Sequence, residues 1–495
     1  MNNVKIKPVT IVIEKYENYS LHISEIKYAF QTLLTIAGIP WLFLPEQATG
    51  PIDIYFGIKP PNRSFKLFIE MSDVKRNNLK IPKEFFEENG IVWPLFNSDR
   101  KNICFTRNPQ DTIHDIHIYD IILPSFYLLS GWQEQFIHLD SKGIHKIEEI
   151  PLYQNKLLHT PIVNQYALFL RDIFQETHNF IPPWPGNKKY ALALSHDVDY
   201  PLMIRWIEAF IYMAKFGLHS QISKIINIFK GEESFWKFDD WIKLEQSYNM
   251  KSAFYFCGLQ GNLIRYFLKA PDPFYDVQQE NFKRIMRLID NKNFEVGMHS
   301  SYFAYSSFNQ FLKEKLQVEK SLGKPIFGNR HHYWHMNPNN PSETALIHEK
   351  IGLIYDSSIC FDKHSGFRYS ICSPFHLYDR IGNKPVSTLQ LPPALMDDHL
   401  FGLSKYCHFE SYQSHIDSLI DSIKKYNGVF VADYHVRGLN TTFYLKFGES
   451  YKYLLKKVAA DNNFYCDTPI NIARYWLERE HKIFKRSKDE DCDFN

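Results

Sequence analysis

Two aspartates separated by a single residue are the feature of the sequence that most directly suggests chemistry. Asp197 and Asp199 stand in the segment Ser-His-Asp-Val-Asp, directly after the apolar residues 190–194. In an extended chain both side chains point to the same side. One carboxylate of such a pair could bind a metal ion while the other stays free as a general base. A turn before Pro201 would use the same residue types, so the pair alone leaves both interpretations open.

Polar side chains follow three further apolar segments of the chain. His299 follows Phe-Glu-Val-Gly-Met, Arg330 follows Pro-Ile-Phe-Gly-Asn, and His435 closely follows Gly-Val-Phe-Val-Ala. Taken singly, such a histidine is more often a loop or strand-end residue than a ligand. Taken together, one or two carboxylates with two or three histidines form a donor set typical of a divalent cation such as Zn²⁺, with positions left open for water.

The elements that must position these residues are short apolar strands that alternate with helical segments. Residues 281–291 and 308–322, for example, show helical spacing, and apolar strands are expected before and after them. About seven such strands over residues 190–480 predict an α/β fold with a parallel sheet, closed as a (β/α) barrel. A barrel brings the loops after its strands to one face, so residues a hundred or more positions apart can converge there.

The ordered set of motifs resembles the polysaccharide deacetylase family, carbohydrate esterase family 4, over about residues 190–480. The resemblance implies a distorted (β/α) barrel and metal-assisted hydrolysis of N-acetyl groups on sugars. It implies Asp197 as the base and Asp199 as a metal ligand, in the variant spacing with one residue between them. It further implies His299 as a second ligand, Arg330 as the support of the base, and His435 as the acid.

One expected ligand is missing from the family's second motif. His299 and the following serine match its first half, but Phe303 stands where a second histidine is usual. His332 or His331 could replace that ligand, and we favour His332. The fourth motif is matched loosely by Gly-Phe-Arg, which gives Arg368 as a second arginine beside the base.

The resemblance therefore implies a hydrolase that removes an N-acetyl or related acyl group from a sugar or glycan intermediate. Its cofactor would be a divalent metal, Zn²⁺ with Co²⁺ or Ni²⁺ as alternatives, held by Asp199, His299 and His332. Two other functions stay open. A related barrel could hydrolyse another C–N bond, in a ureide or cyclic amide, without the usual metal, and Arg368 could then hold a substrate carboxylate. A degenerate barrel could bind a glycan without catalysis.

The first third of the chain predicts a smaller α/β domain without a catalytic constellation. Residues 125–135 and 159–170 resemble an uncharacterised domain that often precedes such barrels in bacterial proteins, and no activity comes with it. A proline-rich segment at 176–189 predicts a linker. The expected divisions are an N-terminal domain at 1–180, the barrel at 187–480 and a charged tail at 481–495.

Composition excludes several classes of function. The 495 residues include 57 Lys and Arg and 55 Asp and Glu, and a net charge of +2 gives no general attraction to nucleic acid or to an anionic membrane. Seven cysteines without a C-x-x-C pair argue against a zinc ribbon or disulfide scaffold, and no signal-peptide core is apparent, so a cytoplasmic location is expected. The uncharged residues 28–45 contain Gly38 and Pro40, which predict a helix and then a strand, with no membrane span.

Overall fold

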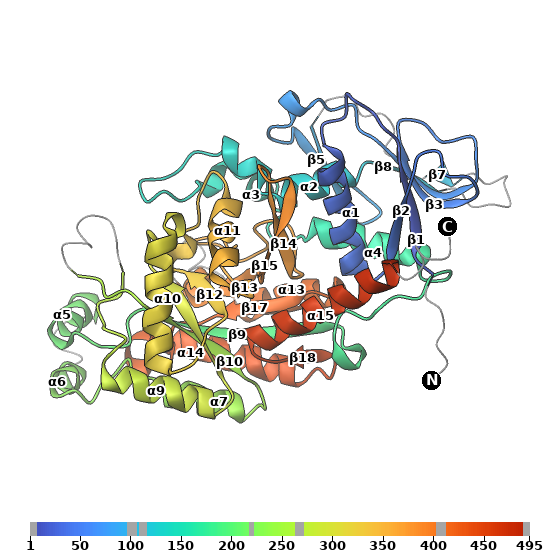
Figure 1. Cartoon of the computed structure of the whole chain (residues 1–495). Coiled ribbons are helices and arrows are strands. Elements are labelled where there is room, and N and C mark those ends of the chain that lie inside the picture. The colour runs from blue at the N-terminus through green and yellow to red at the C-terminus, as the bar shows by residue number, and fades with distance from the viewer. Residues whose placement is uncertain are drawn as a thin grey trace.

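The structure, a computed structural model, contains two β-sheets flanked by helices (Figure 1). It describes residues 7–96, 106–107, 116–216, 222–262, 272–401 and 412–488. A six-stranded sheet lies at one end of the molecule and a ten-stranded sheet occupies the rest. The mixed α/β class expected from the sequence is confirmed.

The smaller sheet has the strand order β2-β1-β3-β4-β8-β7, and a separate hairpin is formed by β5 and β6. Its strands and the hairpin are β1 (Val9–Ile13), β2 (Trp41–Leu44), β3 (Ile52–Gly57), β4 (Phe65–Glu70), β5 (Glu84–Glu88), β6 (Ile91–Leu95), β7 (Thr106–Arg107) and β8 (Ile116–Tyr119). The helices of this region are α1 (Ile23–Ala37), α2 (Ile122–Leu129), α3 (Pro151–Gln154) and α4 (Ile162–Phe174).

The uncharged segment near the N-terminus folds as its glycine and proline predict. Helix α1 ends at Ala37 because Gly38 takes a left-handed conformation (φ 82°) and its N–H caps the last turn. Strand β2 follows at Trp41. Among the described residues, no helix has the length and apolar character needed to cross a bilayer.

The larger sheet has the order β14-β15-β13-β12-β11-β10-β9-β17-β16, and β18 pairs with the first half of β9. All pairs are parallel except β14 with β15. Its strands are β9 (Tyr190–Val198), β10 (Ser252–Cys257), β11 (Glu295–Ser300), β12 (Gly328–His331), β13 (Tyr355–Asp356), β14 (Phe375–Asp379), β15 (Lys384–Gln390), β16 (Pro393–Met396), β17 (Val429–Asp433) and β18 (Phe464–Cys466).

One stretch of chain joins the two ends of the parallel part of this sheet. Strand β15 pairs with β13, and β16, only a few residues later, pairs with β17. The sheet therefore curls, and the carboxyl ends of its parallel strands share one rim. The curled sheet agrees with the expected architecture, while a complete barrel of about seven strands stays a prediction.

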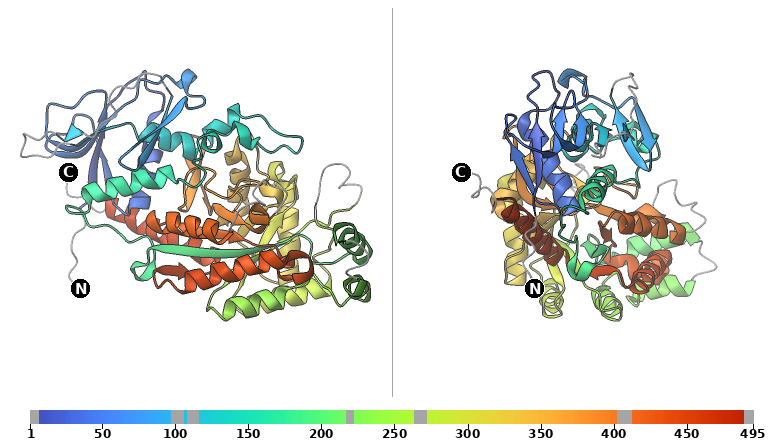
Figure 2. Two further views of the ribbon diagram at one scale, coloured as in Figure 1. Left: turned by 180° about the vertical axis from the view of Figure 1, so that it is seen from behind. Right: turned by 90° about the vertical axis from the view of Figure 1, so that its right-hand side faces the viewer.

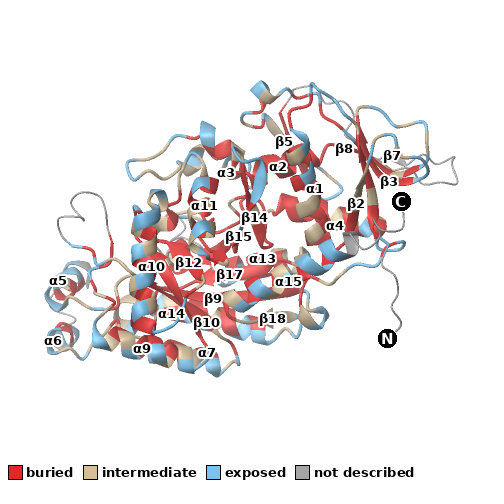
Figure 3. Cartoon of the chain, viewed as in Figure 1, coloured by how far each residue is buried: buried red, intermediate tan, exposed pale blue. Residues whose placement is uncertain are grey.

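Helices cover the outside of the curled sheet, as the views from behind and from the side show (Figure 2). The helices of this region are α5 (Arg205–Phe216), α6 (Ile222–Lys230), α7 (Phe238–Gln246), α9 (Glu280–Asn291), α10 (Phe308–Leu322), α11 (Pro341–Ile351), α12 (Asp397–Phe401), α13 (Tyr412–Lys425), α14 (Thr441–Ala459) and α15 (Pro469–Lys488). Of these, α5 and α6 lie beyond the sheet, at one end of the molecule. Helix α9 buries Phe282, Ile285, Met286 and Ile289 on one face, as its spacing predicts. The interiors of both sheets are buried (Figure 3).

Buried contacts join the N-terminal region to the larger sheet. The guanidinium of Arg479 on α15 is buried and donates to the carbonyl of Thr35 at 2.7 Å and to that of Pro182 at 2.9 Å. Asn164 on α4 donates to Ser373 Oγ at 2.8 Å. These contacts fix the two regions against each other. The division at 180 and 187 stays a prediction, and α15 continues to Lys488, beyond residue 481.

A buried carboxyl group at the start of β11 predicts that the free energy of unfolding depends on pH. Glu295 accepts hydrogen bonds from Tyr355 Oη at 2.6 Å and from the N–H of Ile470 at 2.8 Å. Burial raises the pKa of Glu295 to about 7. Because its folded pKa exceeds the unfolded value, the group favours folding below about pH 4.5, and that contribution is lost as the pH rises through about 7.

Glu295→Gln removes the charge. Its amide oxygen can still accept from the N–H of Ile470, and its amide N–H can donate to Tyr355 Oη, so that the second hydrogen bond is kept with its direction reversed. At about pH 8 the variant is expected to have a free energy of unfolding higher than wild type by up to about 3 kcal/mol. Near pH 4.5 the two should be equal within error. Urea unfolding at both pH values checks this, and an equal difference at both would contradict it.

Candidate metal centre and catalytic site

Strand alternation divides the segment Ser-His-Asp-Val-Asp between two environments. Ser195 and Asp197 point to the same side of β9, and Asp199 follows directly after its end. His196 points the other way, where its Nε2 lies 2.7 Å from Glu245 Oε1 in the core. The sequence therefore brings two carboxylates to the rim, while His196, which precedes them, lies in the core.

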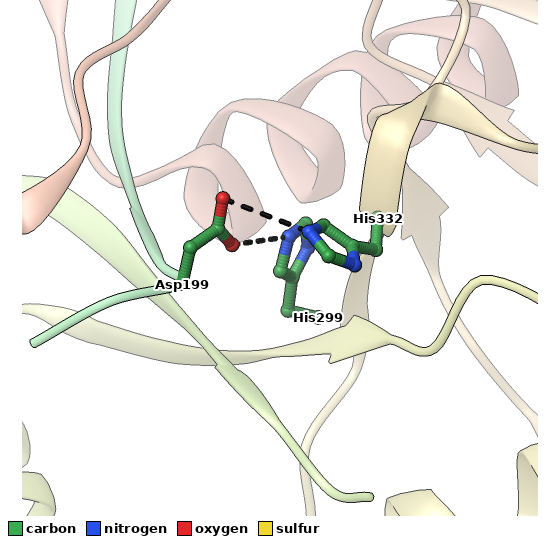
Figure 4. Close-up of side chains that lie close together, drawn as sticks. All are labelled: Asp199, His299 and His332. Carbon is green, nitrogen blue, oxygen red and sulfur yellow. Dashed lines mark ion pairs between the residues drawn. The ribbon is translucent and has the colours of Figure 1, made fainter. Parts of the chain in front are cut away.

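Three side chains from three strand ends meet at this rim (Figure 4). His299 Nε2 on β11 lies 2.9 Å from Asp199 Oδ1, and His332 Nε2, just after β12, lies 3.7 Å from Asp199 Oδ2. One ligand atom from each residue lies within 4.8 Å of the others. The three residues predicted as metal ligands thus lie close together, and their role as ligands stays a prediction.

His331 and His332 point to opposite sides at the end of β12. Arg330 and His332 face the rim, whereas His331 Nε2 lies 2.8 Å from His348 Nε2 in the core. Tyr333 and Trp334 adopt left-handed conformations, with φ of 57° and 56°, which turn the chain directly after His332. Non-glycine residues in this region are strained, and such strain often accompanies functional sites.

The hydrogen bonding of His299 fits a metal ligand. Its Nδ1 lies 2.9 Å from the carbonyl oxygen of Arg330, and a carbonyl can only accept, so Nδ1 carries the proton. A neutral imidazole then has its lone pair on Nε2, toward Asp199. Nε2 and Asp199 Oδ1 are 2.9 Å apart, but their geometry is not that of a hydrogen bond, and neither atom has a hydrogen-bond partner among the described residues. Two buried polar atoms without partners are consistent with a site for an ion bound by both.

The electrostatics of the cluster favour a cation. Burial opposes ionisation of Asp199, but the charges of His332 and His299 outweigh it and hold the pKa of Asp199 well below its usual value. Burial lowers the pKa of His299, yet Asp197 and Asp199 raise it to about 9. The carboxylates of Asp197 and Asp199 thus favour positive charge at this buried position. A divalent cation that binds here would take the place of the extra proton on the imidazole.

Asp197 is held in place by a buried arginine. Arg330 Nη1 lies 2.9 Å from Asp197 Oδ1, 2.8 Å from Asp433 Oδ1 and 2.8 Å from Ser195 Oγ. Burial and then the charge of Asp197 raise the pKa of Asp433 well above its usual value. Asp433 is fully buried, whereas Asp197 lines the cavity at the rim, so Asp197 is the carboxylate that a substrate or water can reach.

His435 is oriented by an aspartate that the sequence analysis missed. His435 Nδ1 and its backbone N–H each lie 2.8 Å from a carboxylate oxygen of Asp397, so Nδ1 is the protonated nitrogen. Its Nε2 faces the cluster, 3.1 Å from Asp199 Oδ2. Asp397 directly follows β16, and residues 393–396 were not recognised as a strand; the rule that found the other polar clusters would have found this one too.

The Asp397 contact makes a prediction about catalysis by His435. In Asp397→Asn the amide group would donate to Nδ1 and place the proton on Nε2 of a neutral ring, the wrong tautomer for a cationic acid. We expect kcat to fall by about 10²-fold or more, with metal content and KM unchanged. Steady-state kinetics with metal analysis checks this, and Asp398→Asn, a neighbour without that contact, is the matched control. An unchanged kcat in Asp397→Asn would remove this role.

A cavity of about 360 Å³ opens onto these residues. Its lining includes Asp197, Asp199, His299, His332 and His435, with the aromatic rings of Tyr333 and Trp334 and the charged Lys142, Lys363 and Arg437. Lys142 comes from the N-terminal region: its carbonyl accepts a hydrogen bond from Tyr302, and its Nζ lies 5.5 Å from the Tyr333 ring centre. No local pattern in the sequence predicts this contact.

Arg368 is the predicted site residue that the structure does not bring to the cluster. Its guanidinium lies 2.7 Å from Glu134 Oε1 and donates to the carbonyl of Cys360 at 3.0 Å. It lines a neighbouring cavity of about 570 Å³. Phe303, at the position of the usual second histidine, is 45% exposed. Of the two arginines expected near the base, Arg330 is the one in contact with it.

Comparison with known proteins gives a partial match at the N-terminus. The model of a family of unknown function, DUF7033, matches residues 16–179. This range lies inside the expected N-terminal division at 1–180. No curated protein matches the chain.

Solved structures resemble about three fifths of the chain. A Mycobacterium smegmatis protein provisionally named a polysaccharide deacetylase is 14% identical, with 60% of this chain and 93% of that chain covered and a TM-score of 0.40. The PuuE allantoinase is 13% identical (61% and 94% covered, TM-score 0.39). A Pseudomonas aeruginosa PAO1 protein, also provisionally named a polysaccharide deacetylase, is 15% identical (61% and 95%, TM-score 0.40). At these values the likeness bears on neither activity nor substrate.

Proposed function

We propose that the chain is a metal-dependent hydrolase of C–N bonds that removes an N-acetyl or related acyl group from a sugar or glycan intermediate. The observation that carries the proposal is the arrangement around Asp199. A carboxylate and two imidazoles lie within 4.8 Å of one another, beside a second carboxylate fixed by an arginine and a histidine fixed by an aspartate.

The residues present suit a divalent cation held by Asp199, His299 and His332. Two imidazoles and one carboxylate form a donor set of catalytic zinc sites, which keep an open position. When bound, the cation would polarise the amide carbonyl and make a water more acidic. Zn²⁺ is the proposed metal, with Co²⁺ and Ni²⁺ as alternatives.

The remaining side chains divide the proton transfers. Asp197, oriented by Arg330, accepts the proton of the attacking water. His435, oriented by Asp397, donates a proton from Nε2 to the nitrogen of the leaving amine, so that the C–N bond breaks to a neutral amine. Such general acid and base assistance is worth about 10²–10⁴-fold. Tyr333 and Trp334 offer flat faces on which a sugar ring can pack.

The test is to remove and restore the metal. Protein stripped with a chelator should regain about one equivalent of Zn²⁺, gain about 2–3 kcal/mol of stability at saturating metal, and release acetate from N-acetylated sugars. Metal content below about 0.2 equivalents with no gain in melting temperature would contradict the proposal. Metal binding with hydrolysis of a ureide in place of an acetamide would retain the centre and reject the N-acetyl substrate.

The contacts of Arg368 bear on the metal-free alternative. A substrate carboxylate bound by Arg368 would have to displace Glu134, which lies 2.7 Å from it. The acetamide substrate needs no such exchange. This is why the metal-dependent deacylation is proposed ahead of the ureide or cyclic amide.

A further inference from the structure

Helices α5 and α6 lie at the end of the molecule farthest from the N-terminal sheet (Figures 1 and 2). They follow directly after the Asp197 and Asp199 segment in sequence. Their inner faces are explained by packing, since Ala209, Tyr212, Ile225 and Ile228 are buried together. These contacts hold the two helices to each other.

The outer faces of the same helices are also apolar. Trp206 and Phe210, one turn apart on α5, are 69% and 68% exposed, and Ile222, Ile226 and Phe229 repeat the pattern on α6. With Ile211 they make six of the eighteen large apolar side chains that are exposed among the described residues. We call these six residues the outer apolar face. A soluble helix normally keeps such a face polar, so a concentration of this kind marks a contact surface.

The charge of α5 and α6 favours an anionic partner for this surface. Helices α5 and α6 contain four basic residues and one acidic residue, a formal charge of +3 in a chain whose total is +2. The single acid, Glu208, is buried, whereas Lys224 and Lys230 are exposed and form no ion pair among the described residues. Tryptophan and phenylalanine beside unpaired lysines are typical of helices that lie in the interface of an anionic bilayer.

The same charge disfavours a second copy of this chain as the partner. Two such surfaces facing each other would bring the exposed Lys224 and Lys230 of one copy against those of the other, and lysine is depleted from protein interfaces. An anionic lipid surface has the opposite sign and accepts the apolar side chains as well.

A cavity connects this surface to the candidate metal centre. About 430 Å³ in volume, it is lined by Asp199 and His332 at one side and by Glu208 and Ile211 of α5 at the other. Ile211 therefore belongs to both the outer apolar face and the cavity wall. A molecule held in a bilayer beneath α5 and α6 would lie next to the entrance of the site.

We infer that α5 and α6 rest on an anionic membrane surface, and that the hydrolase acts on a glycan amide carried by a lipid in that surface. The first part stands on the outer apolar face and its charge. The second part rests on the proposed function.

Vesicle sedimentation tests the first part with the full chain. Wild type should sediment with vesicles of phosphatidylcholine and phosphatidylglycerol, and much less with phosphatidylcholine alone. Trp206→Ser with Phe210→Ser should weaken binding at least about tenfold, and Lys224→Glu with Lys230→Glu should do the same. The matched control is Leu316→Ser with Ile381→Ser, two exposed apolar residues elsewhere, which should bind as wild type does.

Several outcomes would overturn the inference. They are failure of wild type to sediment with anionic vesicles, binding unchanged in the Trp206 and Phe210 variant, or a dimer in sedimentation velocity that this variant dissolves. Equal melting temperatures show that the variants fold. Because vesicle binding needs no turnover, Asp197→Asn should still sediment, so failure of the proposed function leaves this result standing.

The second part is tested with an N-acetyl sugar attached to a lipid in the same vesicles. Wild type should hydrolyse it at least about tenfold faster than the free sugar, and the Trp206 and Phe210 variant should lose that preference while hydrolysing the free sugar as before. Equal rates on both substrates with wild type would reject the lipid-carried substrate and leave the hydrolase intact.

Discussion

Asp197→Asn is expected to lower kcat by about 10³-fold or more while the protein folds and binds metal as before. The amide has nearly the shape of the carboxylate but cannot accept a proton from the attacking water. Its oxygen can still accept the hydrogen bond from Arg330 Nη1, which lies 2.9 Å from Asp197 Oδ1. The loss would therefore belong to proton transfer.

Three measurements separate this effect from damage to the site. Metal content and melting temperature should match wild type, and acetate release should fall. The matched variant is Asp433→Asn, which contacts the same guanidinium but does not line the cavity at the rim. It should retain most of the activity. If Asp197→Asn turned over at the wild-type rate, Asp197 would have no part in the reaction.

His332→Ala is expected to abolish stable metal binding, and with it turnover. Two ligands remain in the variant, Asp199 and His299, and loss of one of three protein ligands removes the chelation that holds a catalytic zinc. Equilibrium dialysis against Zn²⁺ should show the affinity falling by about 10²-fold or more. The rise in melting temperature on adding metal should vanish with it.

His364→Ala is the control for this variant, since His364 is a histidine of the neighbouring cavity and not of the proposed centre. It should bind Zn²⁺ as wild type does. Full Zn²⁺ occupancy in His332→Ala would show that another residue is the third ligand. It would then be open again which residue replaces the histidine that is usual at the position of Phe303.

The parts of the site that could be predicted from the sequence are those governed by strand alternation and by polar residues at strand ends. Asp197, Asp199, His299 and His435 each follow an apolar segment, and parallel strands bring such ends to one rim. The same rule places Arg330 there. In the structure these side chains lie next to one another, and the role of each in catalysis is a proposal.

Other parts depend on contacts that leave no local pattern. Glu134 captures Arg368 across 234 positions of the chain, and Lys142 reaches the cavity from the N-terminal region. Asp397 was missed because Pro392 precedes β16 and Pro393 begins it, and proline argues against a central strand. The choice between His331 and His332 was open because alternation predicts opposite sides but not which side faces the site. In the structure His332 faces Asp199, and His331 faces His348.

The most direct test of the central claim is X-ray diffraction from crystals of the zinc-loaded protein, recorded on both sides of the zinc absorption edge. The account predicts one anomalous peak at about 2.0–2.2 Å from a carboxylate oxygen of Asp199 and from the Nε2 atoms of His299 and His332. Within the part of the chain that the structure describes, two other groups could compete for the ion, His331 with His348 and Asp356, and Asp397 with Asp398 and His435. A peak at either of these, or none near Asp199, would contradict the account.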